Sequence, residues 1–247
     1  MRIATFDTKE AAAAAVAKEI ARALRAAPSL VLALPTGRTP VPFYRELVRL
    51  HRRGRAPFAR ATTFNLDEFI GLGRGDAGSY RAYMDRHLFD HVDLAARRIH
   101  VLDGRARSWR DETARFEAAL GRAGGVDVAV VGIGRNGHVG FNEPGAALAA
   151  GTHRVTLARE TRRANAYLFD DDISRVPTHA LSMGIGTILR ARRVILLATG
   201  RSKAEILRRA IEGPVTTRVP ASLLQVHPAA MVFADRTAAA RLSRKVS

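Results

Sequence analysis

The sequence predicts a single α/β domain with a doubly wound, mostly parallel sheet and helices on both faces, a Rossmann-like architecture. Short apolar runs typical of buried strands recur along the chain. Stretches with helical periodicity lie between most of them, which is the alternation of α/β folds. No linker rich in serine or proline and no block of charge divides the 247 residues. We therefore assign residues 1–247 to one domain.

The first elements end in a loop suited to an anion. A strand near Ile3 and a helix over Lys9 to Ala26 precede an apolar strand from Leu30 to Leu34. In the following loop, Thr39 suits a helix N-cap and Pro40 the first position of a helix over Val41 to His51. The exposed N–H groups of that helix would then bind an anion, unless the turn is only a well-capped helix. The candidate phosphate-binding residues are Thr36, Gly37, Arg38 and Thr39.

Two acids follow the next strand. A short β-rich run near Thr63 ends in Asp67 and Glu68, and then in apolar residues. Burial beside bulky apolar neighbours would raise the pKa of a carboxyl group toward the range useful to a general base. The alternative is that Asp67 or Glu68 caps a following turn. Further elements are expected over Ser79 to His91, near Ile99 and over Trp109 to Ala123.

The central segment joins a strand to candidate acid/base groups. Val128 to Val131 are consecutive apolar residues, which indicate a strand covered on both faces. Glycines at 132, 134 and 137 allow a sharp turn at its carboxyl end, where open α/β sheets place ligands. His138 and Glu143 follow within a few residues, so acid/base chemistry is expected here.

The same glycines spell G-x-G-x-x-G, but their context disfavours a dinucleotide site. That motif requires a helix starting at the third glycine, whereas this chain continues HVGFNEPG. A turn whose glycines serve packing alone is the plainer alternative. A metal site is also disfavoured, because the spacing of His138 and Glu143 matches no common ligand pair and the chain has no cysteine.

The last elements include a second candidate phosphate turn. Strands are expected near Val155, over Val194 to Ala198 and near Met231. Between the last two, Ser202 and Glu205 match the capping-box pattern at the start of a helix over Lys203 to Glu212. Its TGRS turn is spelled like the earlier TGRT turn, which together with Lys203 favours a phosphorylated ligand.

These motifs resemble those of glucosamine-6-phosphate deaminases. The segments that carry the resemblance are PTGRTP (35–40), FNLDEFIGL (64–72), GIGRNGHVGFNEPG (132–145), TRRAN (161–165) and GRSKAE (200–205). The resemblance extends to about Val232. 6-Phosphogluconolactonases share the fold, but they usually have arginine where this chain has Phe69, and they lack the Asn-Glu-Pro after the histidine.

The resemblance implies conversion of glucosamine 6-phosphate to fructose 6-phosphate and ammonia, without metal or cofactor. Asp67 aligns with the carboxylate that shuttles a proton between C2 and C1 of the open-chain sugar. His138 aligns with the imidazole that assists ring opening, and Glu143 and Asn136 complete this catalytic group. The residues expected to bind substrate or its phosphate are Thr36, Gly37, Arg38, Thr39, Gly132, Gly134, Arg162 and Lys203.

Two departures from the family pattern leave alternatives open. Asn136 stands where some members have aspartate, and Arg38 where many have glycine. Arg38 can contact phosphate, point to solvent or narrow the pocket. Galactosamine 6-phosphate and 6-phosphogluconolactone therefore remain alternative substrates. A non-catalytic sugar-phosphate sensor is a further alternative, although the DNA-binding segment such regulators normally carry has no room before Leu30.

The amino-acid composition limits the kinds of partner and the compartment that are expected for this protein. The net charge of +17 comes almost entirely from arginines scattered along the chain without interleaved aromatic residues, so nucleic-acid binding is not expected. No apolar run reaches membrane-spanning length and no signal peptide is recognisable, so neither a membrane nor an export route is expected. With no cysteine, these features favour the cytoplasm. The sequence is compatible with a homo-oligomer but does not predict one.

Overall fold

The computed structural model describes residues 1–243, and within them the main sheet is parallel throughout. Its seven strands lie in the order β1, β10, β9, β6, β2, β3, β5. Their bounds are β1 Arg2–Phe6, β2 Val31–Leu34, β3 Thr62–Asn65, β5 Ile99–His100, β6 Val128–Val131, β9 Arg193–Ala198 and β10 Ala230–Asp235. The predicted fold class is confirmed. The last four residues of the predicted domain 1–247 lie outside the described part.

The strand order reverses between β2 and β6, which pair with each other at the centre of the sheet. From β2 the chain continues outward through β3 to β5. From β6 it continues in the other direction through β9 to β10, which pairs with β1. Such a reversal sends the two central loops to opposite sides and leaves a crevice at the carboxyl ends of the strands, where ligands bind in open α/β sheets.

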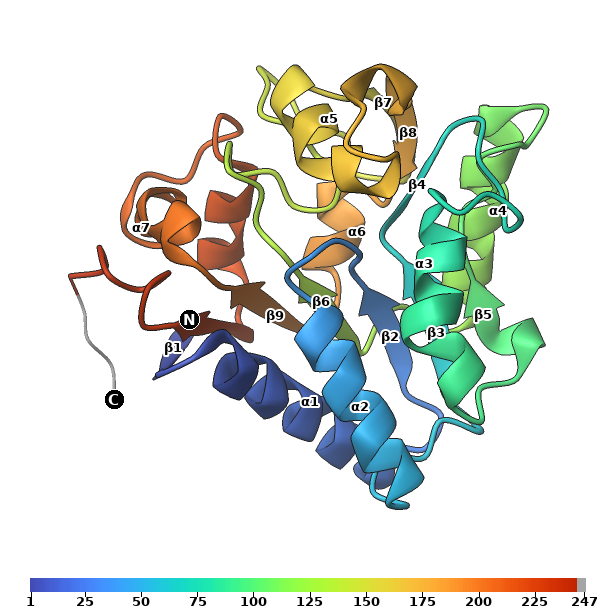
Figure 1. Cartoon of the computed structure of the whole chain (residues 1–247), viewed down its shortest axis with the longest axis horizontal. Helices are drawn as coiled ribbons and strands as arrows, with labels where there is room; N and C mark the ends of the chain where they lie inside the picture. Colours follow the sequence, from blue (N-terminus) through green and yellow to red (C-terminus); the bar gives the residue numbers. More distant parts are fainter. Residues whose placement is uncertain (244–247) are drawn as a thin grey trace.

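Helices cover both faces of the sheet (Figure 1). Helices α1 (Lys9–Ala26), α2 (Val41–Arg52) and α3 (Tyr80–His87) pack on one face. The opposite face is covered by α4 (Trp109–Arg122), α6 (Ile185–Leu189) and α7 (Ala204–Glu212). Strand β2 shows how the sequence specifies this arrangement. Its alternate residues point into the two different apolar layers, so every position of a strand between two layers must be apolar.

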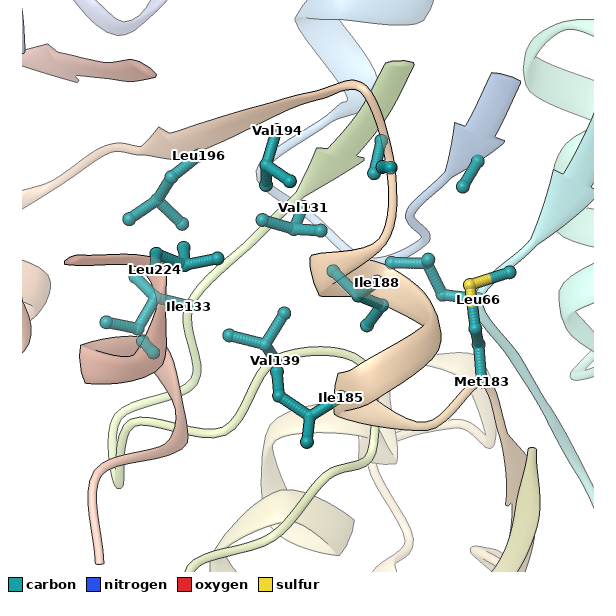
Figure 2. Packing of buried hydrophobic residues seen from close by; sticks show 14 of the residues in the cluster. Leu66, Val131, Ile133, Val139, Met183, Ile185, Ile188, Val194, Leu196 and Leu224 are labelled. Atoms are coloured by element: carbon teal, nitrogen blue, oxygen red, sulfur yellow. The ribbon is translucent and has the colours of Figure 1, made fainter. Parts of the chain in front are cut away.

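The apolar layer on the α6 side also anchors a functional loop. Figure 2 shows Val131 and Leu196, from neighbouring strands, beside Ile188 of α6. Ile133 and Val139, from the loop that follows β6, belong to the same buried cluster. Burial of these two side chains fixes the ends of the segment that carries His138, so its polar residues project from a rigid base.

A second, antiparallel sheet packs above the first. It consists of β4 (Asp67–Phe69), β8 (His179–Ser182) and β7 (His153–Thr156), and only Leu66 separates β3 from β4. In Figure 1, β7 and β8 lie with α5 (Arg159–Asn165) at the top of the molecule. The strand predicted near Val155 therefore exists as β7 but belongs to this second sheet. Its burial alternates along the strand because only one face is covered.

Candidate active site

The loops that follow β2, β3, β6 and β9 surround a cleft of about 910 Å³ at the point where the strand order reverses. All four loops leave the carboxyl ends of parallel strands, so they meet at one edge of the sheet. Helix α5 closes the cleft from above through several side chains that line it. The cleft therefore gathers residues from most of the segments that the sequence motifs mark.

The loop at 35–40 is held by two tyrosine hydroxyls. Tyr44 of α2 donates a hydrogen bond to the carbonyl of Pro35, and Tyr83 of α3 donates to the carbonyl of Gly37 at 2.7 Å. Gly37 has φ +102°, which a residue with a side chain rarely adopts. The cleft is lined by all four predicted phosphate-binding residues of this loop, Thr36, Gly37, Arg38 and Thr39.

The predicted cap of the next helix is wrong. Helix α2 begins at Val41, its N-cap is Pro40 and no side chain caps it, so Thr39 is not the cap. Pro40 is the N-cap itself, so the proline within the first turn is Pro42. The N–H groups of that turn, which Pro42 lacks, carry no side-chain cap and are left for an anion to bind.

Asp67 is a buried carboxyl group that faces the cleft. It lies on β4, is 5% exposed and accepts a long hydrogen bond from the Thr36 hydroxyl, 3.5 Å between Oγ1 and Oδ1. Burial, with the neighbouring charge of Glu68 added, raises the pKa of Asp67 to about 8. Such a group exists in both protonation states near neutral pH and can both take up and return a proton.

Glu68 serves the fold rather than the cleft. It accepts hydrogen bonds from the N–H groups of Phe69, Tyr80 and Arg81, the last two in the first turn of α3. Burial outweighs these bonds and raises the pKa of Glu68 to about 7. The capping alternative considered for this acidic pair is thus correct for Glu68, which caps α3 from a distance, while Asp67 stays free to face the cleft.

His138, Asn136 and Glu143 form one hydrogen-bonded group. Asn136 Nδ2 donates to Glu143 Oε2 at 2.8 Å, and Asn136 Oδ1 accepts from the His138 N–H at 3.2 Å. The imidazole Nδ1 lies 3.5 Å from Glu143 Oε2 and 3.3 Å from the Thr161 hydroxyl. Burial alone would raise the pKa of Glu143, but the hydrogen bond and charge of His138, with Thr161 and Asn136, lower it to about 2. Glu143 is therefore ionised at neutral pH and lies within reach of the imidazole.

The turn before His138 requires a glycine. A Cβ atom at Gly134 would lie 2.2–2.4 Å from three atoms of the His138 ring, so the ring packs directly over the glycine backbone. No helix starts at the third glycine of this G-x-G-x-x-G segment, because the chain continues irregularly to β7. This confirms that the segment lacks the geometry of a dinucleotide site. Gly132 and Gly134 both line the cleft.

Lys203 reaches the cleft from the turn after β9. Its ammonium group donates to the carbonyl of Ile133 at 2.6 Å. Burial, helped by the charge of Arg135, lowers the pKa of Lys203 to about 8. The predicted capping box is wrong: α7 begins after Lys203 without a side-chain cap, and Glu205 pairs instead with Arg208 and Arg241.

Arg162 is the one predicted phosphate contact that points elsewhere. Its guanidinium donates to the carbonyls of Ile173 and Val176, at 2.9 and 2.8 Å, and it does not line the cleft. The side chain thereby fastens the segment after α5 to the helix. Its neighbours Arg159 and Arg163 line the cleft instead. The prediction for Arg162 is therefore not supported by this structure.

Among the further cleft residues that the sequence did not single out are Tyr80, Asn165 and Tyr167. Tyr80 donates its hydroxyl to Asn165 Oδ1 at 2.8 Å, which joins α3 to α5 across the cleft. Asn165 is part of the TRRAN motif and could have been singled out there. Nothing local marks the two tyrosines, because their approach to the cleft depends on how the helices pack.

The described residues also bear on metals and membranes. Within residues 1–243, no group of three or more histidine or acidic side chains is arranged to hold a metal ion. In the same range, no helix is both long and apolar enough to span a bilayer.

Comparison with known proteins agrees with this geometry. The model of the family described as glucosamine-6-phosphate isomerases/6-phosphogluconolactonase matches residues 6–233. Glucosamine-6-phosphate deaminase 2 of Giardia intestinalis is 47% identical over 236 residues, which are 96% of this chain and 90% of that protein. The glucosamine-6-phosphate deaminase of Rhodopirellula baltica is 45% identical over 236 residues, covering 96% of this chain and 94% of that protein.

Solved structures give the same result. A monomeric glucosamine-6-phosphate deaminase superposes with a TM-score of 0.94 at 41% identity, covering 98% of this chain and all of that one (100%). The 6-phosphogluconolactonase of Trypanosoma brucei superposes with a TM-score of 0.72 at 18% identity, over 98% of each chain, which is a likeness of fold alone. The chain belongs to the family of glucosamine-6-phosphate isomerases and 6-phosphogluconolactonases.

Proposed function

We propose that the protein is a glucosamine-6-phosphate deaminase, which converts glucosamine 6-phosphate and water to fructose 6-phosphate and ammonia. One observation carries the proposal: a buried carboxyl group, Asp67, with a pKa raised to about 8, faces the same cleft as the imidazole of His138. The deaminases of Giardia intestinalis and Rhodopirellula baltica, at 47% and 45% identity over nearly the whole chain, support it.

The phosphate of the substrate is bound at the loop 35–40 and by Lys203. The uncapped first turn of α2 offers N–H donors, and Thr36, Gly37, Arg38 and Thr39 surround it. Lys203 adds a positive charge below pH 8, where its ammonium group is protonated. Together these groups compensate a dianion and fix the far end of the sugar. Gly132 leaves room beside it, because no atom lies within 4 Å of the place its Cβ would take, whereas the space beside Gly134 is filled by the His138 ring.

Ring opening is assigned to His138. The ionised carboxylate of Glu143 holds the imidazole in place, and Asn136 fixes the carboxylate in turn. A protonated imidazole can deliver a proton to the ring oxygen while the proton of the anomeric hydroxyl leaves. The product of this step is the open-chain aldehyde.

Proton transfer between carbons is assigned to Asp67. Its ionised form removes the proton from C2, which is acidic because it lies next to the C1 carbonyl, and the same group returns the proton to C1. The aldehyde oxygen gains a proton and the amino nitrogen loses one in the same isomerisation, so C1 becomes an alcohol and the amino group at C2 an imine. Addition of water to C2 then releases ammonia and leaves the ketose. Every step is a proton transfer or an addition of water, so these residues are sufficient for it. Action in the cytoplasm stays a prediction from the sequence, which is compatible with a homo-oligomer without predicting one.

The test is an assay of ammonia and ketose phosphate from glucosamine 6-phosphate, with galactosamine 6-phosphate and 6-phosphogluconolactone in parallel. Stoichiometric ammonia and fructose 6-phosphate from the first substrate are expected. Hydrolysis of the lactone alone would overturn the proposal in favour of a lactonase. Faster release of ammonia from the galactose epimer would change the substrate while leaving the chemistry intact.

A further inference from the structure

Arg38 and Tyr167 meet across the mouth of the cleft. The guanidinium carbon of Arg38 lies 4.3 Å from the centroid of the Tyr167 ring, within the range of a cation–π contact. Arg38 belongs to the loop 35–40, whereas Tyr167 belongs to a short 3₁₀ helix, Ala166–Leu168, directly after α5. Both residues line the cleft. The contact therefore joins the loop proposed to bind phosphate to the segment that covers it.

The backbone that precedes Arg38 is held by hydrogen bonds, whereas the Arg38 guanidinium has no polar partner among the described residues. The hydrogen bond from Tyr83 to Gly37 and that from Tyr44 to Pro35 hold the backbone before it. The side chain itself is exposed, and within residues 1–243 its guanidinium has neither an ion pair nor a hydrogen bond. When one face of a guanidinium rests on an aromatic ring, its N–H groups point outward in the plane, the geometry that matches the oxygens of a phosphate.

Tyr167 contributes its ring face and not its hydroxyl. The hydroxyl oxygen is buried and has no hydrogen-bond partner in the described part of the chain. Burial raises the pKa of this phenol to about 12, although the charges of Arg38 and Arg86 lower it, so the ring is neutral under any assay condition. A ring held by packing rather than by its hydroxyl is a fixed platform for the cation above it.

We propose that Arg38 and Tyr167 form a clasp that closes the phosphate end of the cleft and aims the Arg38 guanidinium at the substrate's phosphate. The clasp rests on the proposed function for the identity of its ligand, a sugar phosphate monoester. It makes Tyr167 a positioning residue, which acts on the phosphate through Arg38. Among the alternatives that the sequence leaves open for Arg38, it favours the phosphate contact over a solvent-directed side chain.

The experiment measures the dissociation constant of inorganic phosphate by calorimetry. Arg38→Met is expected to raise Kd about tenfold, the effect of losing a charge-assisted contact. Tyr167→Leu is expected to raise Kd about fivefold, as the stacked geometry is lost. The double variant should match Arg38→Met alone, because a mispositioned side chain adds nothing once it is absent. Tyr167→Phe keeps the ring face and should recover most of the affinity.

Arg60→Met is the matched control, since it removes the same charge from an exposed residue outside the cleft. With glucosamine 6-phosphate, Tyr167→Leu should raise KM in proportion to Kd and leave kcat within about twofold. Wild-type phosphate affinity in Tyr167→Leu, or additive effects in the double variant, would overturn the clasp. Should Tyr167→Leu fail to fold, the exposed Arg38 still permits the test, with Arg38→Met at wild-type affinity as the overturning result.

Phosphate binding is measured without turnover, so the two proposals can fail separately. Coupled loss of phosphate affinity in an enzyme that releases no ammonia would support the clasp and refute the deaminase. Ammonia release together with unaltered phosphate binding in both single variants would do the reverse.

Discussion

Asp67 combines two demands on one side chain. It must be reachable from the cleft to move a proton, and it must be desolvated for its pKa to approach neutrality. The structure meets both by placing it at the start of a short buried strand that borders the cleft. The sequence could indicate the acid and its apolar neighbours, but it could not separate the role of Asp67 from that of Glu68. That separation depends on α3, which presents its N–H groups to Glu68 alone.

Replacement of Asp67 tests its role directly. Asp67→Asn is expected to lower kcat at least about a hundredfold, the range for loss of an acid/base group, with KM changed by no more than a few-fold because the phosphate contacts remain. Steady-state kinetics of ammonia release provide the measurement. Asp90→Asn, an exposed acid outside the cleft, is the control and should behave as wild type.

The pH profile of the wild-type enzyme provides a second check. Because the ionised form of Asp67 is the base and protonated Lys203 binds the phosphate, and both pKa values are about 8, kcat/KM should rise with pH up to about 8 and fall above it. A profile that is already flat from pH 5 upward, or near-normal turnover in Asp67→Asn, would assign this carboxyl group to structure.

Gly134 is also expected to be irreplaceable, because the His138 ring occupies the space that a side chain would need. Gly134→Ala would place a methyl group inside the His138 ring position, so the imidazole must turn away from the cleft. We expect kcat/KM to fall about a hundredfold, as for other displaced acid/base groups, while the circular dichroism spectrum is retained. In Gly121→Ala, on the exposed side of α4, the new Cβ meets no atom within 4 Å, and activity should be unchanged. Equal activity of the two variants would contradict the packing described for His138.

Helices and strands that are long, or that carry a local cap or an apolar run, could be predicted from the sequence, whereas the short ones could not. Helix α1 has the predicted bounds, and Thr8 caps it by accepting from the N–H of Ala11. The four-residue strand β6 is also where its apolar run predicts it. Helices α5 and α6 and strands β4 and β8 were not anticipated. They are short, and β4 becomes a strand only by pairing with β8, which lies far along the chain.

Strand β4 carries two adjacent buried carboxyl groups, and this should make the stability of the fold depend on pH. Below about pH 3, Asp67 and Glu68 are largely protonated in both the folded and the unfolded chain. As pH rises, the unfolded chain releases these protons first, because the folded pKa values are about 8 and 7. Their contribution to the free energy of unfolding is therefore lost progressively up to pH 8.

Asp67→Asn removes the larger of these two effects. Its gain in the free energy of unfolding over wild type should be about 3–4 kcal/mol greater at pH 8 than at pH 5. Urea denaturation at both values measures it, with Asp90→Asn as the control for the lost charge. A gain that is equal at the two pH values would show that the carboxyl group titrates normally in the folded protein.

For the whole molecule, the net charge of +17 is spread over a surface on which some arginines are paired locally with carboxylates. Several arginines pair with a carboxylate one helical turn away, as Arg49 does with Glu46, Arg115 with Glu112 and Arg208 with Glu205. Such pairs neutralise local charge on the helix surface. The absence of nucleic-acid binding stays a prediction from the sequence.

Metal independence is the prediction for the whole enzyme. The proposed chemistry uses only proton transfer and addition of water, so dialysis against EDTA should leave turnover of glucosamine 6-phosphate unchanged. Enzyme dialysed without chelator is the control, and Mg²⁺ or Zn²⁺ is then returned to both samples. A loss of activity that added metal restores would require a Lewis acid that the assigned residues do not replace.

The pairing of β4 with β8 also determines at which stage of synthesis and folding the Asp67 carboxyl group can become buried. Asp67 lies opposite Ser182, more than a hundred residues later, so a nascent chain cannot bury it until most of the protein has been synthesised. Contacts between such distant segments form late on the folding pathway. Relief of the buried charge by Asp67→Asn should therefore slow unfolding more than about tenfold at pH 8 and leave the refolding rate nearly unchanged. Stopped-flow chevron plots measure both limbs, and an accelerated refolding limb would instead place this pairing in the folding transition state.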